Sequence, residues 1–148
     1  MELKIGRFEA HTLAFAFFTG EGVPASAAEG VRKYAELNHL ISDQVKTYFA
    51  TIVVTQHGVR NVTYIQYLDI KPDSVLPPGF RKVVLPEGPC IQATLTPQEF
   101  KEMEDGTKKE IVEAFLKANN LRLDIKNVLY LAERKENGSI FIRMPVKS

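Results

Sequence analysis

Hydrophobic and polar positions alternate in two similar series along the chain. Residues Glu9–Lys71 are predicted to form, in order, a strand, a helix, a strand, a turn and a strand. Residues Pro89–Lys147 show the same order of patterns. The predicted hairpin turns fall at corresponding places, at His57-Gly58 and at Asn137-Gly138. The pattern therefore predicts a duplicated βαββ unit.

The first half contains strong secondary-structure signals. Residues 11–18 are almost wholly apolar or aromatic, which is typical of a buried strand. Ser26 and Glu29 form a capping-box pattern, which predicts the start of a helix. Residues 48–56 and 62–70 are rich in Val, Ile, Thr and Tyr and flank a short glycine-containing turn, so they predict a β-hairpin.

The second half repeats these signals with different residues. Residues Cys90–Leu95 predict a strand, and the capping-box pattern at 96–99 predicts a helix start directly after it. Gly106 is expected to end or kink this short helical segment. The capping pattern recurs at residues 107–110, where we expect the main helix of this half to begin.

The remaining segments are predicted to be strands and a linker. Val128–Ala132 and Ile140–Val146 would pair as the last hairpin. Pro145 has no N–H group, so we expect the final strand to lie at a sheet edge or to end there. Residues 80–85 predict a short edge strand, and the proline-rich residues 72–79 predict the linker between the halves.

Together these predictions define an α+β fold. Two βαββ units, about residues 1–71 and 80–148, would form one antiparallel sheet with two main helices and a central groove. A chain of 148 residues suits one domain, so we expect residues 1–148 to form a single domain. Grooves of this kind are common binding places for small ligands.

Composition and charge exclude several classes of partner. Hydrophobic residues make up 45% of the chain and charged residues 25%, with a net charge of +1, so no basic excess favours nucleic acid. The longest apolar run is too short to cross a bilayer, and the N-terminal residues lack a signal-peptide pattern. A single cysteine cannot form an internal disulfide. We therefore expect a cytoplasmic protein with no nucleic-acid or membrane partner.

Signals for catalysis, metal or cofactor binding are weak. His11, His39 and His57 have no metal-ligand spacing, and the chain contains neither a glycine-rich phosphate loop nor a nucleophile elbow. Cys90 is interpreted as a small buried strand residue rather than as a nucleophile. We therefore expect no metal, no cofactor and no catalytic residue.

Aromatic residues on the predicted strands are the main candidates for ligand contacts. A buried tyrosine needs a hydrogen-bond partner for its hydroxyl, and aromatic rings suit flat apolar or cationic molecules. Tyr64 and Tyr130 occupy comparable strands of the two halves, so they are predicted to line the groove. Phe17, Tyr48 and Val128 complete the predicted ligand-binding set, with core packing as the alternative for each aromatic ring.

One pair of charged residues allows two interpretations. Glu133 and Arg143 lie on partner strands of the last predicted hairpin, which indicates a cross-strand ion pair. The alternative is that Glu133 is a pocket carboxylate for a cationic or hydroxylated ligand.

Several short motifs of the second half resemble a known family. Residues Leu85-Pro86-Glu87-Gly88 precede a strand, Asn119-Asn120-Leu121 follow the helix, and Ile142-Arg143-Met144-Pro145-Val146-Lys147 end the chain after a strand with Tyr130. With the doubled βαββ order, they resemble the GyrI-like, SOUL-type effector-binding domain. The resemblance implies the ligand-sensing domain of multidrug-responsive bacterial transcription activators, which also occurs alone.

One position departs from the family pattern. Relatives often carry a glutamate two residues before the tyrosine of the penultimate strand, where it meets cationic ligands in the pocket. Aligned on Tyr130, this position is Val128 in the present chain, and Glu133 has the opposite strand parity. The resemblance therefore implies weaker cation recognition here. It also weakens the case for the family's occasional hydrolase activity on reactive cyclopropane-bearing compounds.

Three functions remain open. The first is a small-molecule binding or sensing domain without its own DNA-binding module, for apolar or aromatic molecules, cationic ones included. The second is a protein-interaction or inhibitor protein, as some relatives are toward DNA gyrase, which a sheet edge at 80–85 or an exposed apolar patch would favour. The third is a hydrolase of reactive xenobiotics, which needs a carboxylate of raised pKa in an aromatic pocket.

Overall fold

The computed structural model describes most of the chain and divides it into two compact units. The described residues are 1–19, 33, 36–37, 47–76 and 78–148. Unit 1 comprises Met1–Ala10 and Pro86–Ser148, and unit 2 comprises His11–Leu85. Mostly antiparallel strands and two helices make up the described residues, which confirms the predicted α+β class. The groove between the predicted halves stays a prediction.

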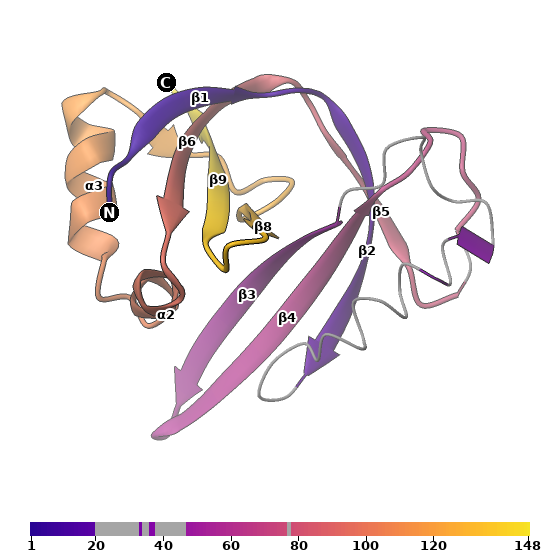
Figure 1. Ribbon diagram of the computed structural model, residues 1–148, viewed down its shortest axis with the longest axis horizontal. Coiled ribbons are helices and arrows are strands. Elements are labelled where there is room, and N and C mark those ends of the chain that lie inside the picture. Colours follow the sequence, from indigo (N-terminus) through magenta and orange to yellow (C-terminus); the bar gives the residue numbers. More distant parts are fainter. Residues whose placement is uncertain (20–32, 34–35, 38–46, 77) are drawn as a thin grey trace. The chain divides into compact units, whose positions relative to one another are not determined.

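Unit 2 contains an antiparallel sheet with the strand order β3-β4-β2-β5 (Figure 1). The strands are β2 (His11–Thr19), β3 (Thr47–Gln56), β4 (Val59–Asp69) and β5 (Arg81–Leu85). The turn at His57-Gly58 joins β3 to β4, and both residues have positive φ, at 51° and 75°. A two-residue hairpin turn of this type requires positive φ at both positions, so the predicted hairpin is confirmed. β5 ends the strand order, as expected for an edge strand.

The two faces of this sheet carry different residues. Tyr67 lies opposite Tyr48 on β3 and opposite Phe15 on β2, so these aromatic residues share one face, which we call the Tyr67 face. The other face holds a buried cluster whose members come from β2, β4 and the segment after β4: Ala14, Leu68 and Ile70, with Leu76 and Phe80 packed against them. Ser26 and Glu29, where a helix is predicted to begin, lie outside the described residues.

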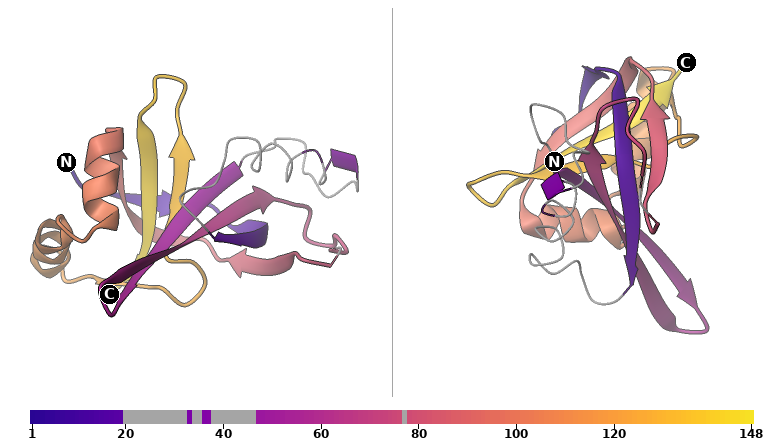
Figure 2. Two further views of the ribbon diagram at one scale, coloured as in Figure 1. Left: turned by 90° about the horizontal axis from the view of Figure 1, so that it is seen from below. Right: turned by 90° about the vertical axis from the view of Figure 1, so that its right-hand side faces the viewer.

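Unit 1 contains strands in the order β1-β6-β9-β8, with β7 paired to the end of β9 (Figure 2). The elements are β1 (Lys4–Phe8), β6 (Gly88–Leu95), α2 (Pro97–Glu104), α3 (Lys109–Ala118), β7 (Arg122–Leu123), β8 (Leu131–Arg134) and β9 (Ile140–Lys147). The sequence patterns did not predict β1 or β7. β1 belongs to unit 1 because it pairs with β6, although it begins the chain.

The two helices of unit 1 begin in different ways. The predicted capping box of α2 is confirmed, since the Glu99 N–H donates to Thr96 Oγ1 at 3.1 Å and the Thr96 N–H donates to Glu99 Oε1 at 3.0 Å. The capping box predicted at Thr107 is wrong. The Thr107 hydroxyl instead donates to the Glu102 carbonyl at 2.8 Å, and α3 starts two residues later without a side-chain cap. This hydroxyl therefore caps a carbonyl in the last turn of α2 and does not cap the N-terminus of α3.

The last hairpin differs from the prediction at two points. β8 begins at Leu131, so Val128 and Tyr130 precede the strand instead of lying within it. The turn is also wider than a two-residue turn. The Gly138 N–H donates to the Lys135 carbonyl at 3.0 Å, and of the turn dipeptide only Gly138 has positive φ. A type I turn followed by a left-handed glycine is the next most common hairpin geometry.

Pro145 lies in an interior strand, so the predicted edge position of β9 is wrong. β9 pairs with β6 on one side, and with β8 and then β7 on the other. The Pro145 carbonyl accepts the Asp124 N–H at 2.8 Å, on the β7 side. In an antiparallel ladder, the N–H and the C=O of one residue point to the same neighbour. The missing N–H therefore falls between the pairings of β8 and β7 and leaves the β6 ladder intact.

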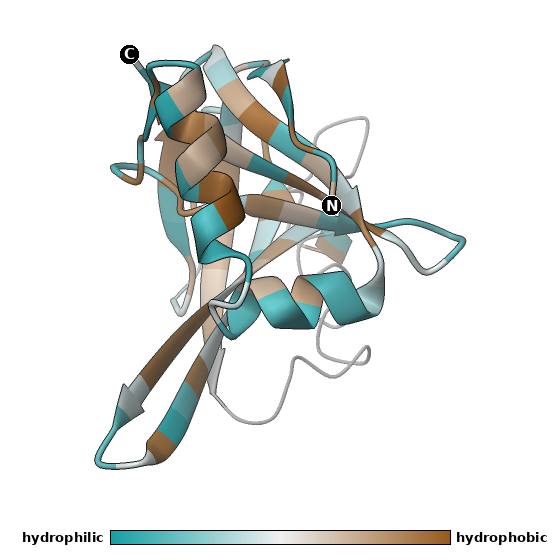
Figure 3. Ribbon diagram, turned by 90° about the vertical axis from the view of Figure 1, so that its left-hand side faces the viewer, coloured by the Kyte–Doolittle hydropathy of each residue, from teal (hydrophilic) through white to brown (hydrophobic). Residues whose placement is uncertain are grey.

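The core of unit 1 lies on one face of its strands. The even-numbered residues of β9 are all buried: Ile140, Ile142, Met144 and Val146. Figure 3 shows α2 and α3 in front of these strands, and each helix contributes a buried residue, Phe100 and Val112. The helices therefore cover the even-numbered face. None of the described helices has the length and apolar character needed to span a membrane.

Candidate ligand-binding faces

A hydrogen-bonded carboxylate lies at one end of the Tyr67 face of unit 2. Asp69 Oδ1 is 2.9 Å from His11 Nδ1, and the Tyr48 hydroxyl donates to Asp69 Oδ2 at 3.1 Å. The side chains of His11 and Asp69 are only 13% and 16% exposed. Each carboxylate oxygen thus has a partner from a different strand, which fixes its orientation.

Tyr48 is held at two places. Its side chain is buried, and its backbone carbonyl accepts a hydrogen bond from Gln66 Nε2 at 3.1 Å. The His11 ring meets the Tyr48 ring edge-on, with 5.8 Å between the centroids. Opposite Tyr48, burial raises the pKa of Tyr67 to about 12, so its hydroxyl stays protonated at neutral pH.

The same face becomes exposed and apolar toward the β3–β4 turn. Phe15 contacts Tyr67 at 5.7 Å and Phe17 at 5.5 Å between ring centroids, and Phe17 is 50% exposed. Strand alternation places three further exposed apolar residues on this face: Ile52, Val54 and Val59. Exposed apolar patches on folded proteins often mark binding surfaces. Val84 on β5 lies opposite Thr12, and therefore on the other face of the sheet.

The structure brings only some of the predicted ligand-binding residues together. Tyr48 and Phe17 share the Tyr67 face, whereas Tyr64 lies on the opposite face because it is an odd number of residues from Tyr67. Tyr130 and Val128 belong to unit 1, where both are buried. The Tyr130 ring meets Phe100 of α2 edge-on at 6.3 Å, which is the core-packing alternative for this residue.

In unit 1, the strand face opposite the helices carries an arginine stacked on aromatic rings. The guanidinium carbon of Arg143 lies 4.8 Å from the ring centroid of Phe8 and 5.8 Å from that of Phe141. Such distances are within the range of cation–π attraction. Gln92 is directly opposite Arg143 on β6, and a Cβ at Gly6 would collide with Gln92 Oε1. We call this surface the Arg143 face.

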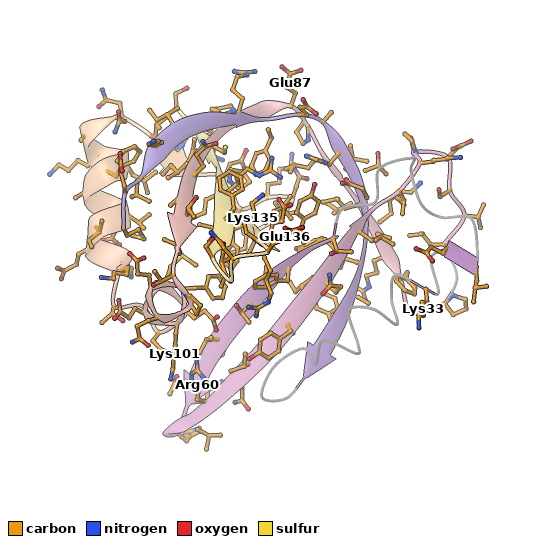
Figure 4. The ribbon with its side chains drawn as sticks, viewed as in Figure 1. Lys33, Arg60, Glu87, Lys101, Lys135 and Glu136 are labelled. Carbon is orange, nitrogen blue, oxygen red and sulfur yellow. The ribbon has the colours of Figure 1, made fainter. Side chains whose placement is uncertain are left out.

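Glu133 lies opposite Phe141 rather than opposite Arg143. Its carboxylate forms an ion pair with Lys135 at 3.5 Å. Lys135 lies near the turn between β8 and β9 (Figure 4). The positive charge of Arg143 also acts on the thiol of Cys90, which is fully buried on β6. Burial raises the pKa of the Cys90 thiol, while Arg143 and a backbone hydrogen bond from Gly6 act in the opposite direction.

Sequence reasoning did not identify Asp69, and it considered Arg143 only as an ion-pair partner of Glu133. The signal for Asp69 was an acidic residue two positions after Tyr67 in the same strand, and the signal for Arg143 was a cation in the otherwise apolar run Ile140–Val146. Among the described residues, no group of three or more His, Cys, Asp and Glu side chains could hold a metal ion.

Comparisons with known proteins identify the fold through structure alone. No protein-family model matches the chain, and no curated protein matches its sequence. A hydrolase from Listeria innocua aligns with a TM-score of 0.60 and 13% identity, covering 99% of this chain and 92% of that one. The EcmrR C-terminal domain aligns with a TM-score of 0.63 and 9% identity, covering 99% and 98%.

A third solved structure, SAV2435 bound to tetraphenylphosphonium, aligns with a TM-score of 0.51 and 15% identity, covering 100% of this chain and 95% of that one. At such identities the likeness establishes the fold and no activity. These findings define an α+β protein that shares its fold with the EcmrR C-terminal domain and with SAV2435.

Proposed function

We propose that this protein binds small aromatic or apolar molecules as a sensing or receptor domain, and that the Tyr67 face of unit 2 contacts them. The observation that carries the proposal is the composition of this face. A rigid, buried aromatic end with Tyr48 and Tyr67 passes through Phe15 to the half-exposed ring of Phe17. Aromatic walls with a few fixed polar groups are typical of small-molecule sites.

Preorganisation of the polar end supports this function. His11, Asp69 and Tyr48 hold one another in a hydrogen-bonded chain, so a ligand would not have to order them. Fixed side chains lower the entropic cost of binding. The fold likeness to SAV2435, whose structure contains tetraphenylphosphonium, adds support, because that protein accommodates a bulky aromatic molecule on a similar fold.

The proposal is tested by a thermal-shift screen of the purified chain against aromatic anions, aromatic cations and neutral aromatic compounds. A ligand that binds only the folded state raises the melting temperature, and the rise continues with the logarithm of the ligand concentration. We expect at least one aromatic compound to give a concentration-dependent shift, with saturable binding measured by calorimetry. The absence of a concentration-dependent shift across all three classes would contradict the proposal.

A matched pair of valines locates the site on one face. Val54 and Val84 are 49% and 58% exposed and lie on opposite faces of the same sheet. Val54→Ala should weaken binding of the screened compound, whereas Val84→Ala should leave it unchanged. The reverse result would place the ligand on the other face.

A protein-interaction function is the second candidate. The exposed apolar residues Ile52, Val54 and Val59 near the β3–β4 turn favour it, as does the edge strand β5. A pull-down that loses a specific partner on Val54→Asp substitution, with no small-molecule shift in the screen, would support this candidate instead.

A further inference from the structure

We propose that Asn137 is a site of spontaneous covalent modification, at which the side-chain amide is lost and an aspartyl or isoaspartyl residue is formed. Asn137 lies in the turn between β8 and β9, with Gly138 directly after it, and both residues are exposed. This turn belongs wholly to unit 1, so the inference is independent of the ligand-binding face proposed for unit 2.

The reaction needs only these two residues and water. The Gly138 nitrogen gives up its proton and bonds to Asn137 Cγ. The Cγ–Nδ2 bond then breaks, and Nδ2 takes up a proton and leaves as ammonia. Water opens the resulting five-membered imide ring at either of its carbonyl groups. One opening gives aspartate, and the other gives isoaspartate, in which the backbone runs through the side chain; no oxidation or reduction takes place.

The attacking nitrogen is unhindered at this position. A Cβ built at Gly138 would meet no heavy atom of the described residues within 4 Å, its chain neighbours aside, so the nitrogen can approach freely. Asn61 and Asn127 are also exposed, but a valine follows each of them. Because the branched Cβ of valine crowds its own backbone nitrogen, these two asparagines serve as internal controls.

Ser139 supplies donors for the charge that develops during the attack. Its N–H donates to Asn137 Oδ1 at 3.0 Å, and its hydroxyl donates to the same oxygen at 2.6 Å. When the Gly138 nitrogen adds to Cγ, this oxygen takes the negative charge of the tetrahedral intermediate. Donors already directed at such an oxygen stabilise the charge without having to reorient.

One hydrogen bond of the turn opposes the reaction. The Gly138 N–H donates to the Lys135 carbonyl at 3.0 Å, and this bond must open before the nitrogen can attack. A single exposed bond of this kind slows the reaction by about tenfold or less. The contacts between Asn137 and Ser139 span only three residues, so they can persist while the bond to Lys135 is open.

The test is incubation of the full chain at neutral pH in water enriched in heavy oxygen, followed by digestion and mass spectrometry. The imide takes one oxygen from water, so products formed during the incubation carry the heavy isotope. We expect Asn137 to convert at least about tenfold faster than Asn61 and Asn127, and faster still as the pH rises, because the deprotonated nitrogen attacks. A rate at Asn137 no higher than at the two controls would overturn the proposal.

Variants of Ser139 test the source of the stabilisation. Ser139→Ala removes the hydroxyl donor and should slow conversion at least about threefold in the folded chain, whereas Ser139→Thr should keep the parent rate. In concentrated urea the parent chain and Ser139→Ala should convert equally, since the folded turn no longer holds the donor in place. Equal rates in the folded chain, or a difference that persists in urea, would overturn the role given to Ser139.

Modification should also weaken the hairpin. The turn sets the register that places Glu133 opposite Phe141, and isoaspartate adds one backbone atom to it. We expect isoaspartyl chains, separated by ion exchange, to melt at a lower temperature than Asn137→Asp, which has the same charge and a normal backbone. Equal melting temperatures would contradict this consequence.

Discussion

The two units each hold a charged side chain on an aromatic sheet face, and they hold it in different ways. In unit 2, the Asp69 carboxylate is hydrogen-bonded by His11 at 2.9 Å and by Tyr48 at 3.1 Å. In unit 1, the Arg143 guanidinium is stacked on Phe8 and Phe141. Hydrogen bonds from two other strands fix the orientation of the Asp69 carboxylate, whereas contacts with aromatic rings hold the Arg143 guanidinium. Asp69 is thus a structural support that links three strands of unit 2.

Removal of Asp69 should have the largest effect on stability. Asp69→Ala leaves His11 and Tyr48 in a half-buried place without their shared acceptor, so we expect a loss of about 2 kcal/mol in the free energy of unfolding. Urea denaturation of Asp69→Ala measures this loss. The exposed Asp73 is the control, and Asp73→Ala should change stability by less than about 0.5 kcal/mol. Equal effects would show that Asp69 is not the support proposed.

The next largest effect on stability should come from Tyr48, one of two tyrosines that face each other on β3 and β4. Tyr48→Phe removes the hydroxyl that donates to Asp69 and should cost about 1 kcal/mol. Tyr67 lies directly opposite and contacts Phe15 through its ring, so Tyr67→Phe should cost less than Tyr48→Phe. Chemical denaturation of the two variants measures both losses. A loss for Tyr48→Phe no larger than that for Tyr67→Phe would show that the Tyr48 hydroxyl does not stabilise the fold.

Arg143→Gln should have a smaller effect on folding than Asp69→Ala. A cation–π contact contributes about 0.5–1 kcal/mol when it is partly exposed, so the variant should remain folded with a slightly lower denaturation midpoint. A loss larger than that of Asp69→Ala would reverse the comparison and make Arg143 the structural residue.

The smallest effect concerns the Cys90 thiol. Because Arg143 lowers the thiol pKa against the upward effect of burial, Arg143→Gln should raise the pKa of Cys90 further. Thiolate absorbance as a function of pH measures this shift. Arg134→Gln is the control, because Arg134 lies opposite Ile140 on the other face of the strands. Since the folded pKa is already raised, the stability contribution of the protonated thiol is complete below the unfolded pKa and is lost as the pH rises through the folded one. An unchanged titration would indicate that the charge of Arg143 does not reach Cys90.

Local signals in the sequence predicted those elements that local chemistry determines. The turn at His57-Gly58, the Thr96 capping box and the apolar strand at residues 11–18 all depend on residues close in the chain. Thr107 was misassigned because its hydroxyl had two possible backbone partners, and the carbonyl of Glu102 lies outside the capping pattern.

The missed features depend on pairings between distant residues. β1 could be assigned only by its pairing with β6, and the interior position of Pro145 depends on the short strand β7. Strand alternation alone puts Asp69 on the same face as Tyr67, but its partner His11 is 58 residues away in sequence. Tyr64 was chosen by analogy with Tyr130 between the halves, and analogy says nothing about which face of β4 is aromatic. Only the register of β2, β3 and β4 identifies that face.

The account's central claim, that the Tyr67 face binds small aromatic molecules, is tested most directly by following side-chain methyl signals by NMR during titration with a compound from the screen. The account predicts that the signals of Ile52, Val54 and Val59 move and saturate together while those of Val84 stay in place. Ring currents of a bound aromatic ligand would produce such shifts. Saturable movement of Val84 alone, or no movement with any aromatic compound, would contradict the claim.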